Sequence, residues 1–208
     1  MRKLFRSSLL AAGLAATSLF TPSFAGEDRK GFYITGSVGI ADIYDIDISS
    51  TLGGGSFQFD PGFNGEVGAG YAWGNGLRTE FSYNSLNSDM KSIQGASVSI
   101  PVDVTSWFVT GAYDFRQGKK WQPYVSGSIG TSNIDVEVAT TIGSVAVTVG
   151  DDEVTTLAGK LGMTYEASEK VDIYGEGWIH SYDDFTIGAI SFTDCVSTGL
   201  SVGLRVKI

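Results

Sequence analysis

Cysteine, histidine and basic residues are scarce in this sequence of 208 residues. It has one cysteine (Cys195), one histidine (His180), and 14 lysines and arginines against 23 acids, a formal net charge of −9. A single cysteine excludes an intramolecular disulfide framework and a cysteine-based zinc site. The shortage of clustered positive charge argues against binding to a nucleic-acid backbone. We therefore expect no nucleic acid among the partners.

Apolar runs long enough for a transmembrane helix are also lacking. The most apolar stretch, residues 9–20, is shorter than the ~20 residues that such a helix needs. It follows a basic start and precedes Ser23 and Ala25, small residues at positions −3 and −1 of a signal-peptidase site. We interpret 1–25 as a signal peptide and 26–208 as one domain of an exported protein. That mature chain carries a charge of −12, from 11 basic and 23 acidic residues.

Beyond residue 30 the dominant period of the apolar residues is two. Eight segments alternate in this way, are rich in β-branched and aromatic residues, and are separated by glycine and asparagine. Each has about the length of a tilted membrane-crossing strand, ~9–11 residues, and no comparable window has helical spacing. The pattern predicts an all-β fold. The predicted strands are 31–41, 63–73, 77–85, 104–115, 121–131, 155–167, 171–181 and 197–208.

The connections between these segments alternate in length. Three are short turns (74–76, 116–120 and 168–170), and the other four are loops of roughly 15 to 23 residues. This rhythm is typical of an up-and-down outer-membrane barrel, whose short turns face the periplasm and whose long loops face outward. The long loops hold fourteen acids against Lys91 alone, whereas the turns hold four bases against Glu169. We therefore predict an acidic outer end and a basic periplasmic end.

The two faces of the predicted strands differ in polarity. One face comprises 40 positions without a single charge, with aromatic residues toward both ends, and the other is rich in glycine and serine. The second face is too poor in charge for a solvated surface, so we assign the apolar face to lipid and the polar face to a narrow lumen. The prediction is an eight-stranded antiparallel transmembrane barrel. The ten lumen charges are Glu66, Arg78, Glu80, Asp114, Lys160, Glu166, Asp172, Glu176, Arg205 and Lys207.

These features together resemble a known superfamily. Gly31-Phe32-Tyr33 opens the first segment, Pro123-Tyr124-Val125 lies in the fifth, and the alternation continues to Ile208. Over residues 31–208 the chain is similar to the small eight-stranded outer-membrane barrels of the OmpA, OmpX and opacity-protein superfamily. The resemblance implies a monomer in the cell outer membrane, in contact with its lipids and lipopolysaccharide. It also implies insertion by the barrel-assembly machinery, although members usually end in phenylalanine rather than isoleucine.

The lumen charges are the most specific candidate site. Centring the third turn on Glu169 places Glu176 opposite Gly162, so that Lys160 is its diagonal neighbour, ~7–8 Å away. Three further charges point into the same interior at nearby heights, and buried charges need partners because an unpaired one costs several kcal/mol. The cluster would fill the lumen, or act as a gate that opens a narrow water path. The hypothesis is an ion-paired plug of Glu66, Glu80, Lys160, Glu176 and Arg205.

No catalytic, metal or cofactor site is predicted. Ser181 follows the only histidine, His180, and adjacent strand residues point to opposite faces, so the two cannot form a nucleophile–base pair. Cys195 is interpreted as a small residue near the outer start of the last strand. The acidic segments 45–47 and 151–153 lack the spacing of an EF-hand loop and are interpreted as solvated surface, with divalent bridging to lipid headgroups as the alternative. We expect a protein that is not an enzyme.

The predicted function follows from the plugged lumen and the acidic loops. We expect a structural or surface-interaction (adhesin-like) role, in which a ligand outside the cell would bind through the loops. The alternative is a narrow pore for ions or small solutes. The loops contain no motif that names a ligand.

Overall fold

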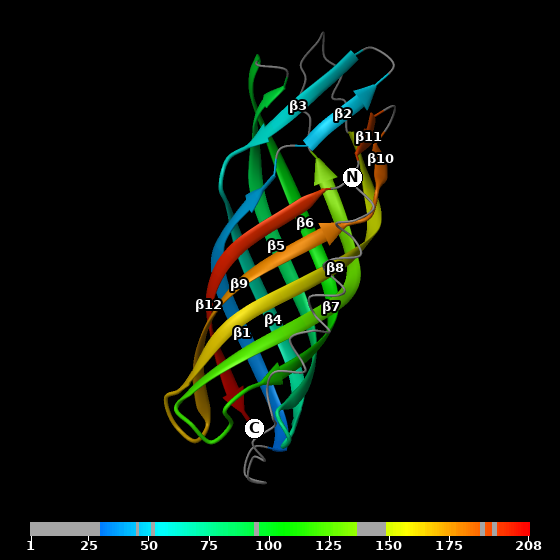
Figure 1. The fold of residues 1–208 in the computed structure, drawn as a ribbon. Helices are drawn as coiled ribbons and strands as arrows, with labels where there is room; N and C mark the ends of the chain where they lie inside the picture. Colours follow the sequence, from blue (N-terminus) through cyan, green and yellow to red (C-terminus); the bar gives the residue numbers. More distant parts are fainter. Residues whose placement is uncertain are drawn as a thin grey trace.

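The computed structural model has eight long antiparallel strands that close into a barrel (Figure 1). In these strands β-branched and aromatic residues alternate with small polar ones, as the two faces of a pleated strand require. Each strand pairs with the next along the chain, and β1 pairs with β12 to complete the ring. Closure leaves no strand edge unpaired along the wall. The barrel strands are β1 (Lys30–Ile43), β4 (Gly62–Trp73), β5 (Leu77–Ile93), β6 (Ala96–Asp114), β7 (Trp121–Val136), β8 (Val149–Glu166), β9 (Val171–Tyr182) and β12 (Val196–Lys207).

The described part of the chain begins at β1. The predicted signal peptide, 1–25, lies outside it. Within the described part, no helix is long and apolar enough to cross a membrane. The structure describes residues 30–44, 46–50, 53–93, 96–136, 149–187, 190–192 and 195–208.

The eight predicted strands and the three short turns are confirmed. In the turn between β4 and β5, Gly74 and Gly76 have φ angles of 80° and 90°, in the left-handed region that glycine adopts without strain. The backbone amide of Leu77 donates to Asn75 Oδ1 at 3.1 Å, which closes this turn. Short turns therefore connect the strands at one end of the barrel, as the spacing predicts.

The opposite end differs from the prediction, because the described parts of the long loops are largely β-strand. Strands β5 to β8 continue past their predicted outer ends, and four short strands, β2 (Ile46–Ser50), β3 (Gly53–Phe59), β10 (Phe185–Ile187) and β11 (Ile190–Phe192), lie beside them (Figure 1). They pair in the order β10–β11–β2–β3–β5 and form an outer tier above the barrel wall.

An apolar interior accounts for this strand extension. At and just beyond the predicted strand ends, several inward-facing positions carry apolar residues that are buried inside the barrel mouth. Burying these side chains stabilises the extended hairpins. The backbone N–H and C=O groups of the hairpins are already satisfied by hydrogen bonds between the paired strands. We call this group the outer apolar core. It consists of Leu86, Val102, Val104, Ile134 and Val154.

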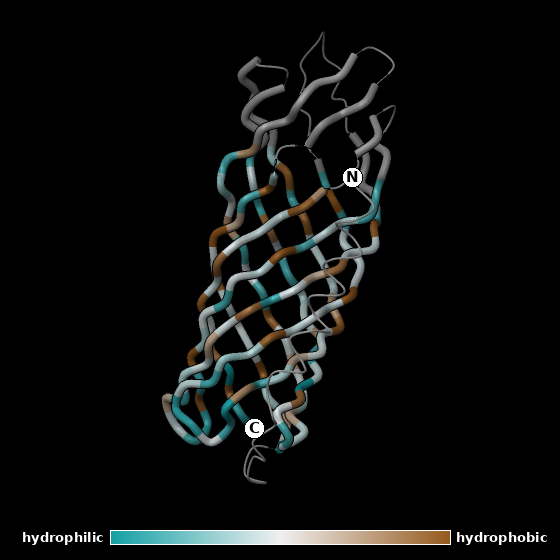
Figure 2. The backbone as a smooth tube through the Cα atoms, in the orientation of Figure 1, coloured by the Kyte–Doolittle hydropathy of each residue, from teal (hydrophilic) through white to brown (hydrophobic). Residues whose placement is uncertain are grey.

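The predicted assignment of the outer face is confirmed. Of the 23 large hydrophobic side chains that the structure exposes, only Tyr44 lies outside the predicted apolar face. Leu161 is 69% exposed and Val67 is 59% exposed, and apolar positions recur along the strands of the wall (Figure 2). Such a surface suits lipid rather than water. Near the turns the rings of Trp121 and Tyr165 lie 4.7 Å apart, as part of an aromatic girdle.

Candidate functional site in the barrel lumen

All eight barrel strands contribute buried charged or aromatic side chains to the lumen. Strand pleating points every second residue inward, which brings side chains from opposite walls together in a narrow interior. Their contacts form three groups, centred on Lys160, Arg78 and Arg205. One buried member from each strand, in chain order, is Tyr33, Glu66, Arg78, Asp114, Tyr124, Lys160, Glu176 and Arg205.

The first group, the Lys160 cluster, joins Lys160 to Glu66 and Glu176. Lys160 Nζ lies 2.5 Å from Glu66 Oε1 and 3.2 Å from Glu176 Oε1. The phenol of Tyr124 donates to Glu176 Oε2 at 2.5 Å, and the amide of Asn84 donates to Glu66 Oε2 at 3.4 Å. Each carboxylate thus has a cation and a second donor, which is what a buried charge needs.

The second group is built around Arg78. Its guanidinium binds Asp114 in bidentate fashion, with Nε 2.7 Å from Oδ2 and Nη2 3.0 Å from Oδ1. The same guanidinium carbon lies 5.3 Å from the ring centroid of Tyr124 and 5.8 Å from that of Tyr33. Both distances are within the range of a cation–π contact. Arg78 therefore links the wall to two aromatic rings in the lumen.

The third group pairs Arg205 and Lys207 with Asp172. Lys207 Nζ lies 2.9 Å from Asp172 Oδ1, and Arg205 Nη1 lies 3.6 Å from Oδ2. Arg205 also faces the rings of Tyr33 at 5.3 Å and Tyr174 at 5.8 Å. Tyr33 consequently contacts guanidinium groups of two clusters, and the three groups form one continuous set of contacts across the lumen.

The predicted plug residues are only partly brought together. Glu66, Lys160 and Glu176 are in direct contact. Arg205 forms its ion pair with Asp172 instead of with these three residues. Glu80 is half-buried on the same inner face, and within the described part of the chain it makes no ion pair. The contacts that sequence reasoning missed are those of Arg78, Asp114 and Asp172.

The missed pairs follow from strand register. Arg78 lies opposite Ala112, so Asp114 is its diagonal neighbour, and Arg205 lies directly opposite Asp172. In the sequence-based prediction both strand pairs are joined by long loops, and only a short turn lets the register be read from the sequence. The sequence did contain one signal for these pairs, which is that the two strands of each pair carry opposite charges near the same end.

The lumen is also more aromatic than predicted. Beside its small polar residues, the described inner face carries six buried phenylalanine, tyrosine and tryptophan rings, and five of them lie opposite an inward-facing glycine on the neighbouring strand. A Cβ atom at any of these glycines would overlap the ring, so glycine provides the space in which the ring lies across the next strand. The pairs are Tyr33–Gly70, Phe108–Gly130, Tyr124–Gly162, Tyr174–Gly203 and Trp178–Gly199.

His180 occupies the lumen toward its outer end. Its ring is almost completely buried and stacks on Trp178, with the two ring centroids 4.4 Å apart. The centroid of the Phe108 ring lies 5.1 Å from that of His180. Ser181 is exposed on the opposite face, so the two side chains form no nucleophile–base pair. Within the described part of the chain, no three His, Cys, Asp or Glu side chains gather into a group that could hold a metal ion.

Hydroxyl groups and the outer apolar core fill the lumen mouth. Ser132 Oγ lies 2.7 Å from Ser106 Oγ and 2.6 Å from Thr156 Oγ1, which forms a hydrogen-bonded row across three strands. The outer apolar core is buried on the same inner face, toward the loop ends of the strands. Ion pairs and aromatic rings on the turn side and apolar packing on the loop side therefore both fill the interior.

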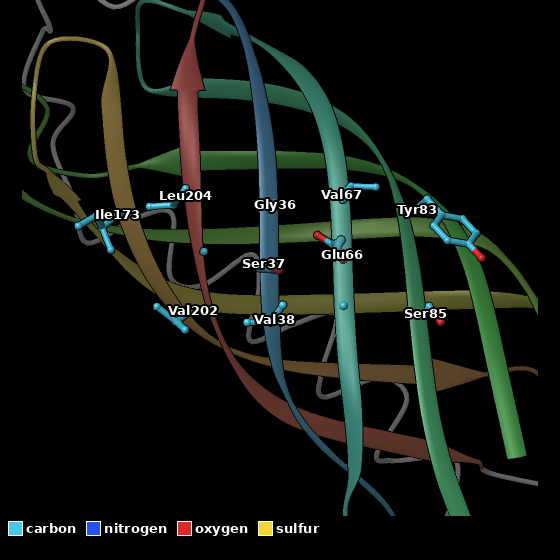
Figure 3. A pocket seen from close by; sticks show the side chains of 12 residues that line it. Gly36, Ser37, Val38, Glu66, Val67, Tyr83, Ser85, Ile173, Val202 and Leu204 are labelled. Carbon is cyan, nitrogen blue, oxygen red and sulfur yellow. The ribbon is translucent and has the colours of Figure 1, made fainter. Parts of the chain in front are cut away.

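A hollow of about 640 Å³ in the wall offers a different kind of surface (Figure 3). It spans β4, β1 and β12, where Val38, Val67 and Val202 are more than half exposed. A Cβ at Gly36 would meet no atom within 4 Å, so the absence of a side chain there helps to open the hollow. Because exposed apolar side chains border it on the outward face, we place it against lipid and locate the polar chemistry in the lumen.

A family model described as the outer membrane protein β-barrel domain matches residues 9–207. The chain belongs to this family. As an outer-membrane β-barrel domain, it lies in the outer membrane and contacts membrane lipid along its apolar wall. No curated protein matches the sequence.

Solved structures of outer-membrane barrels share the fold. Neisserial surface protein A has a TM-score of 0.60 at 21% identity, covering 86% of this chain and 97% of that one. OprG from Pseudomonas aeruginosa has a TM-score of 0.57 at 14% identity, covering 86% and 98%. The outer membrane protease OmpT from Escherichia coli has a TM-score of 0.52 at 6% identity, covering 91% and 98%. At these identities the likeness establishes the fold, a small outer-membrane barrel, and no activity.

Proposed function

We propose that this barrel is a closed envelope protein with a structural and surface-interaction role, and that it does not conduct ions. The single observation that carries the proposal is the Lys160 cluster, in which one buried ammonium holds two buried carboxylates inside the lumen. Opening a path there would separate charges that low-dielectric surroundings hold together, at a cost of several kcal/mol. The outer apolar core adds a second barrier, because water and ions avoid a packed apolar interior.

The loop end of the barrel supplies the surface for interaction. Asp42, Asp89, Asp135 and Asp183 are exposed near the loop ends of the barrel strands. The paired strands of the outer tier lie at the same end, so the loop end presents a folded acidic surface to the outside. A ligand with clustered positive charge is the complementary partner, because opposite potentials speed encounter and align the two surfaces.

Insertion into the membrane depends on the last strand in this proposal. Val202, Leu204 and Val206 alternate on the outward face of β12 and are exposed, and Ile208 continues the series. The barrel-assembly machinery would recognise this alternation, with isoleucine in place of the usual terminal aromatic residue. Once inserted, the loop end would face the lipopolysaccharide leaflet.

A narrow pore is the second candidate, and Glu80 is the observation that favours it. This half-buried carboxylate lies on the inner face without an ion pair among the described residues, so it offers Lys160 or Arg205 an alternative partner. Re-pairing would let the lumen open transiently. In this case Glu80→Gln would alter single-channel conductance, whereas a closed barrel would show no channels with either residue.

Shortening the outer end of the β5–β6 hairpin, on which β3 pairs, tests the surface-interaction role. Ser88 and Val102 are directly opposed, so an Asn-Gly turn between them can replace residues 89–101 and leave the membrane-spanning barrel intact. Cells displaying the full-length protein should adhere to an extracellular-matrix coating more strongly than cells with the truncated form. Heat-modifiable gel migration would confirm that both barrels are folded. Equal adherence of the two cell types, with both barrels folded, would refute the surface role.

A further inference from the structure

The short-turn end of the barrel carries an exposed basic surface that the lumen does not use. Three of its residues lie in the turn between β6 and β7, and the fourth lies in the turn between β8 and β9. All four side chains are exposed, and Glu169 is the exposed acid of these turns. We call this surface the basic turn patch. It consists of Arg116, Lys119, Lys120 and Lys170.

Aromatic residues fix the depth of the basic turn patch. Trp121, whose ring contacts Tyr165, directly follows Lys120, and Phe115, whose ring centroid lies 5.0 Å from that of Tyr113, directly precedes the β6–β7 turn. Aromatic girdles mark the boundary between hydrocarbon and headgroups in outer-membrane barrels. The basic side chains begin where this girdle ends, which places them at the level of lipid phosphates.

Two carboxylates near this surface are turned into the lumen and away from it. Asp114, at the end of β6, is buried against Arg78 in the lumen, and Asp172, near the start of β9, is buried against Arg205 and Lys207. Each acid is neutralised inside the barrel. Its charge therefore offsets little of the positive potential that the turns direct outward.

The turns also hold the basic residues in place. Gln122 Nε2 donates to the carbonyl oxygen of Lys119 at 2.6 Å. The backbone amide of Glu166 donates to the carbonyl oxygen of Lys120 at 2.9 Å. The backbone amide of Lys207 donates to the carbonyl oxygen of Lys170 at 2.8 Å. These bonds tie the two turns to β7, β8 and β12, so the backbone that carries the basic residues is held in place at the barrel rim.

We propose that the basic turn patch binds the phosphate groups of anionic phospholipids in the periplasmic leaflet. Exposed Lys and Arg side chains at an anionic leaflet attract its headgroups, and the patch presents four of them beside aromatic anchors. The binding is independent of whether the lumen conducts. It would anchor the turn end at a fixed depth and enrich anionic lipid around β6 to β9.

Lipid selectivity in reconstituted bilayers tests this proposal. The folded barrel is placed in phosphatidylcholine bilayers with trace spin-labelled phosphatidylglycerol or phosphatidylcholine, and electron paramagnetic resonance measures the fraction of each lipid immobilised by the protein. We expect the relative association of phosphatidylglycerol to exceed that of phosphatidylcholine on the order of twofold. Salt at about 1 M, where the Debye length is about 3 Å, should remove the preference.

Charge variants distinguish the patch from the net charge of the protein. The fourfold glutamine variant of the patch should lose the preference for phosphatidylglycerol, and the milder Lys119→Gln/Lys120→Gln variant should lose part of it. The matched control, Asp135→Asn/Asp183→Asn, changes charge at the opposite end and should keep the wild-type preference. Heat-modifiable migration confirms folding of each variant.

Three results would overturn the proposal. The first is equal association of the two lipids with the wild-type barrel. The second is a preference that persists in the folded fourfold variant. The third is binding of the wild-type barrel to purified peptidoglycan that the fourfold variant loses while its lipid preference stays unchanged, since the patch would then serve the cell wall.

Discussion

Replacing Lys160 by methionine tests the energetic role of the Lys160 cluster. Lys160 is 8% exposed, and its ammonium contacts Glu66 at 2.5 Å and Glu176 at 3.2 Å. Methionine fills a similar volume but leaves two buried carboxylates without their cation. Removing one partner of a buried ion pair costs about 3–5 kcal/mol. We therefore expect the free energy of unfolding to fall by about this amount in Lys160→Met.

The assay is equilibrium unfolding in urea, with the barrel folded in phospholipid vesicles and followed by tryptophan fluorescence. A triple variant, Lys160→Met with Glu66→Gln and Glu176→Gln, serves as the matched control. It removes both carboxylate charges together with the cation. The free energy of unfolding should therefore recover much of the way toward the wild-type value, because the penalty in the single variant comes from unpaired carboxylates. A loss below about 1 kcal/mol in the single variant, or a triple variant no more stable than the single one, would refute this reasoning.

Two further predictions use the same urea assay. A methyl group at Gly162 would overlap the ring of Tyr124, whereas one at Gly127 would meet nothing within 4 Å. Gly162→Ala should therefore cost about 1–3 kcal/mol and Gly127→Ala close to nothing; equal effects would contradict the aromatic–glycine packing. Arg78→Lys keeps the charge but loses the bidentate contact with Asp114, and should cost about 1–3 kcal/mol. That loss should largely disappear in the background of Asp114→Asn, and a full loss there would contradict the pairing.

Strand number, face assignment and turn positions could all be predicted from the sequence. A period of two needs no knowledge of tertiary structure, and an uncharged face of 40 positions leaves lipid as its natural solvent. The register of one strand pair was also predictable: Glu176 does lie opposite Gly162, because a three-residue turn fixes how β8 and β9 align.

The rest of the lumen required tertiary information. Arg205 meets Asp172 across β9 and β12, and Arg78 meets Asp114 across β5 and β6. In both cases a long predicted loop between the segments hid the register. The inward aromatic residues escaped prediction for a different reason. The strand pleat points Tyr124 inward, but its ring has room there only because its neighbour across the strand is a glycine, which is a property of the pair.

The outer tier was not predicted because its strands are short and separated by breaks in the sequence. Ladder pairing past Leu86 depends on apolar partners such as Val102 and Val104, which come from the far side of the hairpin. Read singly, these segments look like acidic loops. Their shared interior explains why the strands continue.

Conductance of the wild-type protein tests the central claim, a lumen closed by buried ion pairs, most directly. The predicted mature chain, 26–208, would be refolded and inserted into a planar lipid bilayer, with circular dichroism and heat-modifiable migration confirming the barrel. We predict a folded barrel without discrete channels. Discrete single-channel events that Glu176→Gln abolishes or alters would contradict the account and identify the lumen as a gated pore.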